Sequence, residues 1–280
     1  SNAGHARVPD RVVDTQELAD RSPKRHPPNL VGRPATCRAF LSGNARSDVP
    51  NPEPRNPPTT PDRSTVSSMR IDVDAVMFDN DGVLVDSAAQ VNEAWSQLAS
   101  EFDLDIETLA GELAGVRAID TLGQYLNGSE LNAAVDRLED LEIDLAATVR
   151  ALPGAVDLCA ALPSGTWTIV TSASRRLGEA RWNGAGIRMP RDTITADDVV
   201  HGKPDPEPYE RAAMLLRVNP QQCVVFEDSP SGAESARRAG ATLIAVGDLN
   251  WDFEPFARIE DLGAVSLIQP SNTLVTLDIH

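Results

Sequence analysis

The sequence predicts an α/β fold built on a Rossmann-like parallel sheet, and three observations support this prediction. Short apolar runs typical of strands alternate with amphipathic helical stretches from residue 71 to residue 268. The interval 88–152 interrupts the alternation with helical patterns alone. Polar and acidic residues directly follow several of the apolar runs, which is where an open parallel sheet places a ligand site.

The strands and helices are expected in a regular order. The first strand is expected over residues 71–78, where β-branched and apolar residues lead into Asp79. Later strands are expected at 167–170, 224–226 and 243–246, with a weaker one at 265–268. Amphipathic helices are expected at 155–162, 177–185, 209–216 and 231–239.

Three regions follow from these patterns. Residues 69–87 and 153–280 form the predicted α/β core, and residues 88–152 form a small helical cap domain that ends at Pro153-Gly154. Residues 1–68 contain eleven of the 21 prolines and show no apolar periodicity, so we expect a mostly disordered arm. Ser1-Asn2-Ala3 is typical of the remnant of a cleaved purification tag.

Charge and cysteine usage restrict the class of partner. Residues 1–68 carry ten Lys and Arg against seven Asp and Glu, whereas residues 69–280 carry 15 against 35. The strong negative charge of residues 69–280 argues against nucleic acid and anionic membranes as partners and favours a small molecule. The three cysteines form no metal-type pair, and no apolar stretch approaches the ~20 residues of a membrane span. We therefore expect a cytoplasmic protein. That it works as a monomer is a separate expectation, on which charge and cysteines have no bearing.

The first acidic motif is Asp79-Asn80-Asp81-Gly82. In an extended segment the side chains of Asp79 and Asp81 project the same way, and neighbouring carboxylates of this kind favour a hard cation such as Mg²⁺. Gly82 allows a tight turn beside them. A plain surface turn explains this motif alone equally well.

Three later segments supply the other candidate residues. Ser172 stands where a strand meets a helix, so it either holds a phosphate oxygen or caps the helix. Lys203 is one of only two lysines in the chain, so it is either a phosphoryl-binding ammonium or a surface lysine. Glu227 and Asp228 end an apolar strand, so they either bind a metal or favour a helix N-terminus.

Taken together, four segments resemble the four motifs of the haloacid dehalogenase superfamily of phosphatases. They are FDNDGVLVDS (78–87), IVTSAS (169–174), ITADDVVHGKPDPEPY (194–209) and VVFEDSPSGAESARRAG (224–240). The resemblance covers residues 71–250 and implies that superfamily's core fold. The position of the cap after the first motif corresponds to the family's C1 type.

The resemblance also implies roles for individual residues. Asp79 would be the nucleophile that forms an aspartyl-phosphate, and Asp81 the general acid and base. Ser172, with Ala173 beside it, and Lys203 would bind the phosphoryl group. The side chains of Asp79 and Asp228 and the main-chain carbonyl of Asp81 would hold Mg²⁺, with Glu227 adjacent.

Within the superfamily, the motifs look most like those of phosphatases of small sugar and polyol phosphates, such as 2-deoxyglucose 6-phosphate and glycerol phosphate. The segment GVRAIDTL (115–122) resembles their substrate-facing cap loop, which makes Arg117 a candidate for substrate contact. Residues 88–152 hold thirteen acids against three arginines, so the cap would disfavour a second anionic group unless Arg117 compensates. An exposed helix arginine is the alternative interpretation of Arg117.

Other activities of the same superfamily need residues that differ from those found here. A β-phosphoglucomutase shares the motifs, but such mutases carry a histidine where Val91 stands and an arginine where Ala118 stands, so hydrolysis is favoured. Phosphonate hydrolysis needs a lysine in the cap, and residues 88–152 contain none. Dehalogenases use the first aspartate without a second acid, whereas this chain has the second acid, Asp81. A non-catalytic phosphate-binding module is the alternative from a different class.

Overall fold

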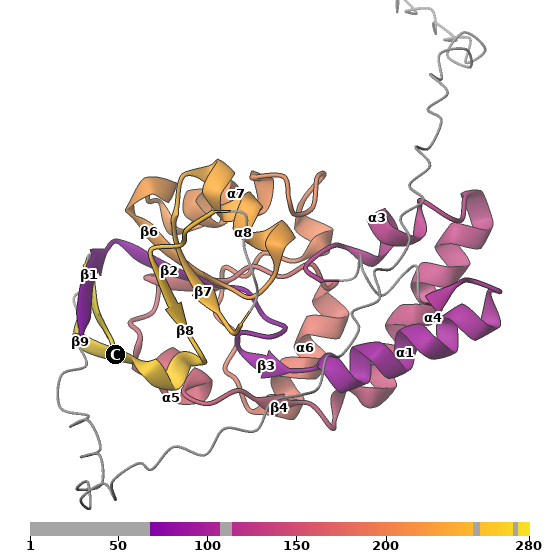
Figure 1. Ribbon diagram of the computed structural model, residues 1–280, viewed down its shortest axis with the longest axis horizontal. Coiled ribbons are helices and arrows are strands. Elements are labelled where there is room, and N and C mark those ends of the chain that lie inside the picture. Colours follow the sequence, from indigo (N-terminus) through magenta and orange to yellow (C-terminus); the bar gives the residue numbers. More distant parts are fainter. Residues whose placement is uncertain (1–67, 107–113, 249–252, 271–273) are drawn as a thin grey trace, which may run out of the picture. The chain divides into compact units, whose positions relative to one another are not determined.

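The computed structural model describes residues 68–106, 114–248, 253–270 and 274–280. The predicted arm, apart from Ser68, lies outside these residues. A five-stranded sheet in the order β5-β2-β6-β7-β8 forms the core, and all of its pairings are parallel (Figure 1). Its strands are β2 (Ala75–Phe78), β5 (Trp167–Ile169), β6 (Cys223–Glu227), β7 (Thr242–Val246) and β8 (Ala257–Ile259). The predicted α/β parallel fold is confirmed.

Helices cover both faces of this sheet, as the buried side chains of β2 illustrate. Val76 and Phe78 pack in a cluster with residues of α5 and α6, whereas Ala75 and Met77 pack with residues of α7 and α8. Alternate side chains of a strand point to opposite faces, so a strand buried on both faces is apolar throughout. The helices are α5 (Ala155–Ala161), α6 (Arg175–Ala185), α7 (Glu207–Leu216) and α8 (Pro230–Ala239).

Two strand predictions differ from the structure. The single strand expected over residues 71–78 is two strands, β1 (Met69–Val73) and β2, divided at Asp74. β1 belongs to a separate antiparallel sheet in the order β1-β10-β9, with β9 (Val265–Pro270) and β10 (Val275–Ile279). The expected strand at 265–268 therefore exists but is not part of the parallel sheet, because an apolar run indicates a strand without specifying its partner.

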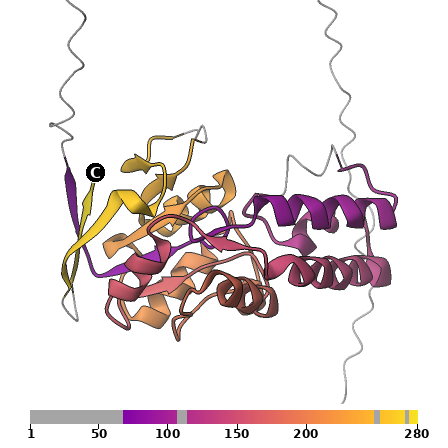
Figure 2. The ribbon, with the colours of Figure 1, turned by 90° about the horizontal axis from the view of Figure 1, so that it is seen from below.

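Among the described residues, three helices lie between the first motif and the rest of the core. They are α1 (Ala88–Glu101), α3 (Ala118–Leu122) and α4 (Gly128–Ala146), and α1 and α4 lie side by side in Figures 1 and 2. They share an apolar cluster of their own that includes Trp95, Leu98 and Leu138. The proposed cap thus contains a small hydrophobic core.

Two short paired strands flank this group of helices in the sequence. β3 (Val85–Asp86) pairs antiparallel with β4 (Arg150–Ala151). The sequence pattern of the cap showed no strand, because two residues are too few to show periodicity. Short 3₁₀ helices complete the described elements: η1 (Ala196–Asp198), η2 (Pro220–Gln222) and η3 (Leu262–Ala264). Across the described residues, no helix is both long and apolar enough to cross a bilayer.

Candidate active site

Three neighbouring strands bring the predicted motifs to one edge of the sheet. Asp79 follows β2, Glu227 ends β6 with Asp228 next, and Ser172 lies three residues beyond the end of β5. The Asp79 amide donates to the carbonyl of Phe226 at 2.9 Å, which extends the parallel ladder into the motif. Because β5, β2 and β6 are adjacent and parallel, residues far apart in sequence meet at their carboxyl ends.

Lys203 lies at the centre of a buried polar cluster. Its Nζ donates to Asp79 Oδ1 at 2.7 Å, to Glu227 Oε1 at 2.6 Å and to the carbonyl of Val170 at 3.0 Å. The residue is 2% exposed, so the surface-lysine interpretation is wrong. Burial alone would lower the pKa of Lys203, but the charges of Asp79 and Glu227 outweigh it and raise the pKa above its ordinary value.

Both carboxylate oxygens of Glu227 accept hydrogen bonds. Oε1 accepts from Lys203 and from the Tyr209 hydroxyl, at 2.6 and 2.9 Å. Oε2 accepts from the amides of Asp228 and Ser229 and from the Ser229 hydroxyl, at 3.0 to 3.1 Å. A Cβ at Gly232 would lie 1.6 Å from Oε1, so only glycine fits beside this carboxylate. Glu227 is therefore a fully satisfied buried acid.

Asp79 and Asp228 are the carboxylates of this cluster whose pKa values the fold raises. Burial, followed by the charge of Glu227, raises the pKa of Asp79 to about 7, and burial, followed by the charge of Asp79, raises that of Asp228 to about 9. Oxygen atoms of Asp79, Glu227 and Asp228 lie within 4.8 Å of one another. Gly82 has φ +78°, and a Cβ there would lie 1.8 Å from Asp228 Oδ2. Hard oxygen donors gathered in this way fit a divalent metal ion.

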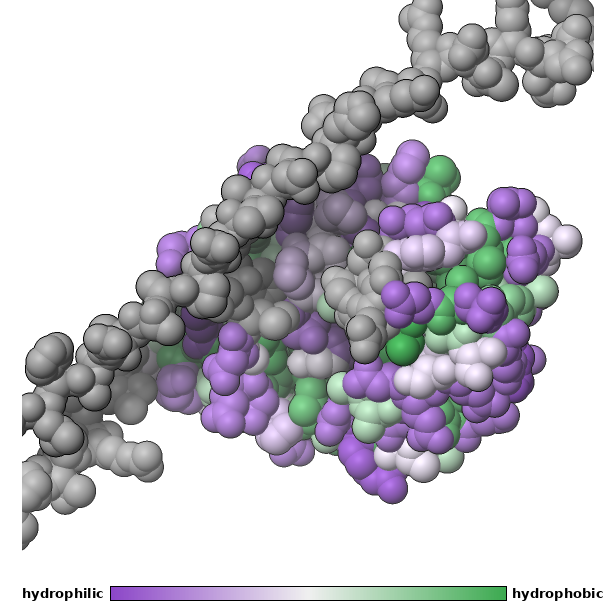
Figure 3. Space-filling view, turned by 45° about the vertical axis from the view of Figure 1, so that its right-hand side comes forward, coloured by the Kyte–Doolittle hydropathy of each residue, from purple (hydrophilic) through white to green (hydrophobic). Residues whose placement is uncertain are grey.

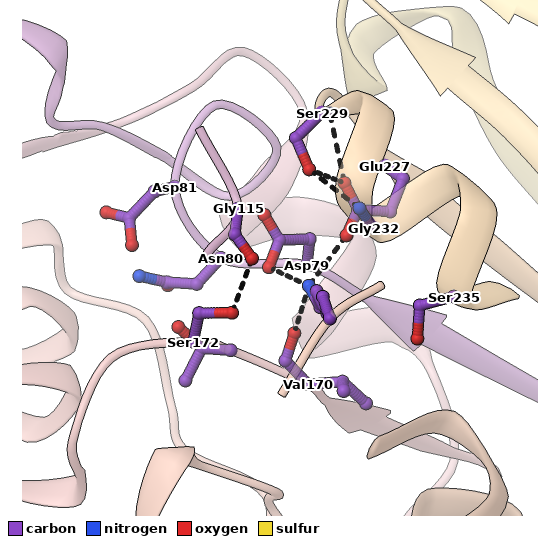
Figure 4. A network of polar contacts seen from close by, with 12 residues as sticks. Asp79, Asn80, Asp81, Gly115, Val170, Ser172, Glu227, Ser229, Gly232 and Ser235 are labelled. Atoms are coloured by element: carbon purple, nitrogen blue, oxygen red, sulfur yellow. Dashed lines mark hydrogen bonds and ion pairs between the residues drawn. The ribbon is translucent and has the colours of Figure 1, made fainter. Parts of the chain in front are cut away.

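Asp81 lies to one side of this cluster. Its side chain points away from Asp79 in Figure 4. Oδ1 accepts from the hydroxyl of Ser87 at 2.5 Å, and Oδ2 pairs with the buried guanidinium of Arg181 at 2.8 Å. The same guanidinium donates to Glu142 on α4 at 3.0 Å, and burial raises the pKa of Glu142 to about 7. Asp81 therefore borders the pocket without touching Asp79.

The cap loop that follows residue 113 reaches the site directly. The Ser172 hydroxyl donates to the carbonyl of Gly115 at 2.6 Å (Figure 4), and the Ser231 hydroxyl donates to that of Ala114 at 2.8 Å. Gly115 has φ +72°, and a Cβ there would lie 2.1 Å from Ser229 Oγ. Ala173 lines the pocket, and its amide donates to the side chain of Thr171. The loop is thus seated on the strand ends.

Arg117 lies in the same loop and joins cap to core. Its guanidinium donates to Asp120 at 2.6 and 2.9 Å, and to the carbonyls of Val199 and Val200 at 3.2 and 3.1 Å. The interpretation of Arg117 as an exposed helix residue is wrong, because its side chain is 13% exposed and lines the pocket. Its charge is already paired with Asp120.

A pocket of about 780 Å³ lies between the strand ends and the cap helices. The described lining residues include eight acids and only two cations, Arg117 and Arg181, each of which pairs with a carboxylate. Apolar side chains such as Val91 and Trp95 form another part of the wall. Hydrophilic residues cover much of the described surface on the face in Figure 3. The pocket is acidic, with no unpaired cation among its described residues.

Sequence reasoning missed three residues of this site. The sequence places Tyr209 at the end of the third motif and the start of a predicted helix without giving it a role, although it contacts the same carboxylate as Lys203. Arg181 looked like an ordinary residue of an amphipathic helix, and Ser87 like the end of a motif. Chain separations of 100 and 39 residues from Asp81 and Glu142 leave no local signal for the contacts of Arg181.

Comparisons with known proteins agree with the geometry. The family model described as haloacid dehalogenase-like hydrolase matches residues 73–240. Hexitol phosphatase A of Escherichia coli is 39% identical over 175 residues, which cover 61% of this chain and 81% of that protein. Glycerol-1-phosphate phosphohydrolase 2 of Saccharomyces cerevisiae is 30% identical over 194 residues, covering 65% of this chain and 78% of that protein.

A solved structure gives the same answer for the fold. The crystal structure of a hydrolase from Pseudomonas syringae aligns with a TM-score of 0.61 at 22% identity, covering 68% of this chain and 94% of that one. The family match extends over more than half of the chain and includes the strand ends that meet at the pocket. The chain therefore belongs to the haloacid dehalogenase-like hydrolase family, and it is an enzyme.

Proposed function

We propose that this enzyme is a Mg²⁺-dependent phosphomonoester hydrolase that acts on a small sugar or polyol phosphate through an aspartyl-phosphate. The observation that carries the proposal is the buried contact of Lys203 with Asp79, a residue that lines the acidic pocket. A nucleophile beside a fixed ammonium suits phosphoryl transfer, in which negative charge on the transferred group must be balanced.

In the first step the free carboxylate oxygen of Asp79 attacks phosphorus, and the bond from phosphorus to the leaving oxygen breaks. Asp81 gives its proton to that oxygen. In the second step Asp81 takes a proton from water, which attacks phosphorus and releases inorganic phosphate from Asp79. Lys203 and Ser172 bind the phosphoryl oxygens, with Ala173 next to them.

The Mg²⁺ ion would be held by the carboxylates of Asp79 and Asp228 and by the main-chain carbonyl of Asp81. When bound, it supplies positive charge that offsets the phosphoryl and carboxylate oxygens. Glu227 stays beside the metal site, because all of its described partners are hydrogen-bond donors and one of them is Lys203. We propose that Glu227 fixes Lys203 and does not ligate the metal.

The pocket supports a substrate with a single phosphate group and an uncharged body. The exposed acids of its described lining, Asp86, Asp136 and Asp197, would repel a second phosphate or a carboxylate. The guanidinium of Arg117 is already paired with Asp120. Hydroxyl groups can donate to such acids without charge repulsion. The hexitol and glycerol phosphates in the names of the relatives have bodies of this kind.

Phosphate release from a panel of monophosphates and bisphosphates, with Mg²⁺ and with EDTA, tests the proposal. We expect metal-dependent hydrolysis that is highest on one sugar or polyol monophosphate, and none by Asp79→Asn. The panel includes β-glucose 1-phosphate, assayed for glucose 6-phosphate. Isomerisation without net phosphate release would mean a mutase, and full activity of Asp79→Asn would refute the nucleophile.

A further inference from the structure

Arg181 is a buried cation that the proposed mechanism leaves without a role. It lies on α6 and is 3% exposed. One guanidinium nitrogen donates to Asp81 at 2.8 Å, and another donates to Glu142 at 3.0 Å. A single side chain of the core thus joins the loop after the nucleophile to α4 of the cap.

The other oxygen of Asp81 is held by Ser87, the residue that precedes α1. The Ser87 hydroxyl donates to it at 2.5 Å. Ser87 precedes α1, where a serine usually accepts a hydrogen bond from the first turn of the helix, but its side chain makes no such bond here. Asp81 is therefore fixed at both oxygens, while its side chain remains 32% exposed and borders the pocket.

We propose that Arg181 is a positioning residue for Asp81, and that its bond to Glu142 makes the orientation of Asp81 depend on the packing of α4 against α6. This inference rests on the proposed function, because it takes Asp81 to be the general acid and base. A guanidinium with one fixed nitrogen on each carboxylate transmits the position of one partner to the other. The cap would then align the acid as well as enclose the substrate.

In the first step, the position of Asp81 matters only when the leaving oxygen needs its proton. As the bond from phosphorus to oxygen breaks, a sugar or polyol alkoxide must take the proton of Asp81, whereas 4-nitrophenolate is stable enough to leave without it. In the second step both substrates give the same aspartyl-phosphate. A misplaced Asp81 should therefore slow phosphoryl transfer from the sugar or polyol phosphate and not from 4-nitrophenyl phosphate. It should slow hydrolysis of the intermediate by the same factor whichever substrate formed it.

Residue 182 provides a matched control on the same helix. The Trp182 indole donates to Asn80 Oδ1 at 2.7 Å, so α6 holds Asn80 through Trp182 and Asp81 through Arg181. Trp182→Phe removes a buried contact between the same helix and the same loop but leaves both bonds of Asp81 in place. Its effect measures general loosening of the loop.

The experiment compares single-turnover phosphoryl transfer from a hexitol phosphate and from 4-nitrophenyl phosphate by the full-length enzyme with Mg²⁺. We expect Arg181→Gln to slow transfer from the hexitol phosphate about a hundredfold, as loss of general acid catalysis does, and transfer from the nitrophenyl ester less than about threefold. Arg181→Lys, which keeps a cation, and Glu142→Gln, which keeps an isosteric acceptor, should show smaller differences of the same kind. Trp182→Phe should change both rates by one common factor.

Two further comparisons keep the outcome decisive. In an Asp81→Asn background, Arg181→Lys and Glu142→Gln should have no additional effect on transfer from the hexitol phosphate. If Arg181→Gln does not fold, these two conservative variants give the same leaving-group comparison. If the arginine variants slow phosphoryl transfer from both substrates equally, the role of Arg181 is overturned and the proposed function is not. No phosphate release by the wild-type enzyme would overturn the proposed function and this inference with it.

Discussion

The buried cluster at the strand ends and the wall of the cap pocket differ in how far their charged side chains are exposed to solvent. In the cluster, Asp79, Lys203 and Glu227 are all buried, and each carboxylate meets the ammonium at 2.6 or 2.7 Å. In the pocket, acids such as Asp136 are exposed, and the arginines are paired with carboxylates.

The two environments permit different kinds of change. A buried charge that loses its partner is costly, because its desolvation is no longer offset. An exposed carboxylate keeps most of its hydration and acts on a ligand through a field that salt weakens. The cluster therefore fixes the chemistry, and the pocket wall is the region where selectivity among phosphate esters can vary.

The largest expected effect is the loss of Lys203. Lys203→Met leaves Asp79 and Glu227 buried without a cation, so we expect the free energy of unfolding to fall by about 3–5 kcal/mol in EDTA. Hydrolysis should fall by about a thousandfold, as when a preorganised charge that stabilises the transition state is removed. Urea unfolding and phosphate release measure the two effects.

A second variant separates stability from catalysis. Lys203→Met combined with Glu227→Gln removes one buried charge, so it should recover part of the lost stability and none of the activity. Recovery of activity in this double variant would mean that Lys203 serves the fold and not the phosphoryl group.

Without the metal, the stability of the fold should depend on the protonation of Asp79 and Asp228, the two carboxylates proposed to bind it. The folded protein raises the pKa of Asp79 from 3.8 to about 7 and that of Asp228 from 3.8 to about 9. Proton binding by Asp79 and Asp228 therefore stabilises the metal-free fold, and this contribution is fully present below pH 3.8, the ordinary pKa of both groups. It is lost as pH rises through about 7, where Asp79 ionises, and then through about 9, where Asp228 ionises. Activity should vanish in EDTA at every pH.

Thermal unfolding between pH 6 and pH 9 measures the corresponding loss of stability. In EDTA, Tm should fall across this range by on the order of 5 °C, and the gain on adding Mg²⁺ should be larger at pH 9, because Mg²⁺ binds the ionised carboxylates. Asp228→Asn is the control, since it should flatten the profile. A wild-type profile that stays parallel to that of the control would contradict the assignment.

The sequence predicted the cluster better than its surroundings, for a physical reason. Asp79, Ser172 and Glu227 follow apolar runs, and parallel strands place such residues at one edge, so their meeting could be inferred from local patterns. The family and the parallel fold are confirmed. The contacts of Arg181 join residues on separate helices and loops, and no periodicity encodes them.

The antiparallel sheet was missed for a similar reason. β1 and β10 pair across more than two hundred residues, from Met69 opposite Ile279 to Val73 opposite Val275. An apolar run shows that a strand is favoured there but not which strand it will join. The division of the first predicted strand at Asp74 became visible only with this partner in place.

A smaller effect is expected on the pocket wall. Asp136→Lys replaces an exposed acid of the pocket with a cation, so we expect kcat/KM for a hexose bisphosphate, relative to the monophosphate, to rise about tenfold at low salt. Asp144→Lys makes the same charge change on the same helix outside the described lining of the pocket. A similar rise with Asp144→Lys would attribute the effect to net charge instead of the pocket.

The smallest expected effect tests Arg117, which stands between the two regions. The resemblance of residues 115–122 to the cap loop of sugar phosphatases predicts that Arg117 contacts the substrate. In that case Arg117→Met should raise KM about fivefold and leave kcat within about twofold, because binding that is equal in the ground state and the transition state is lost. Asp120→Asn removes the carboxylate that pairs with the guanidinium, so it should lower KM by freeing a cation for the substrate. If Arg117 only holds the loop to the carbonyls of Val199 and Val200, both variants should raise KM together. Opposite shifts in KM would make Arg117 a specificity residue of the cap, whereas parallel shifts would assign it to the link between cap and core.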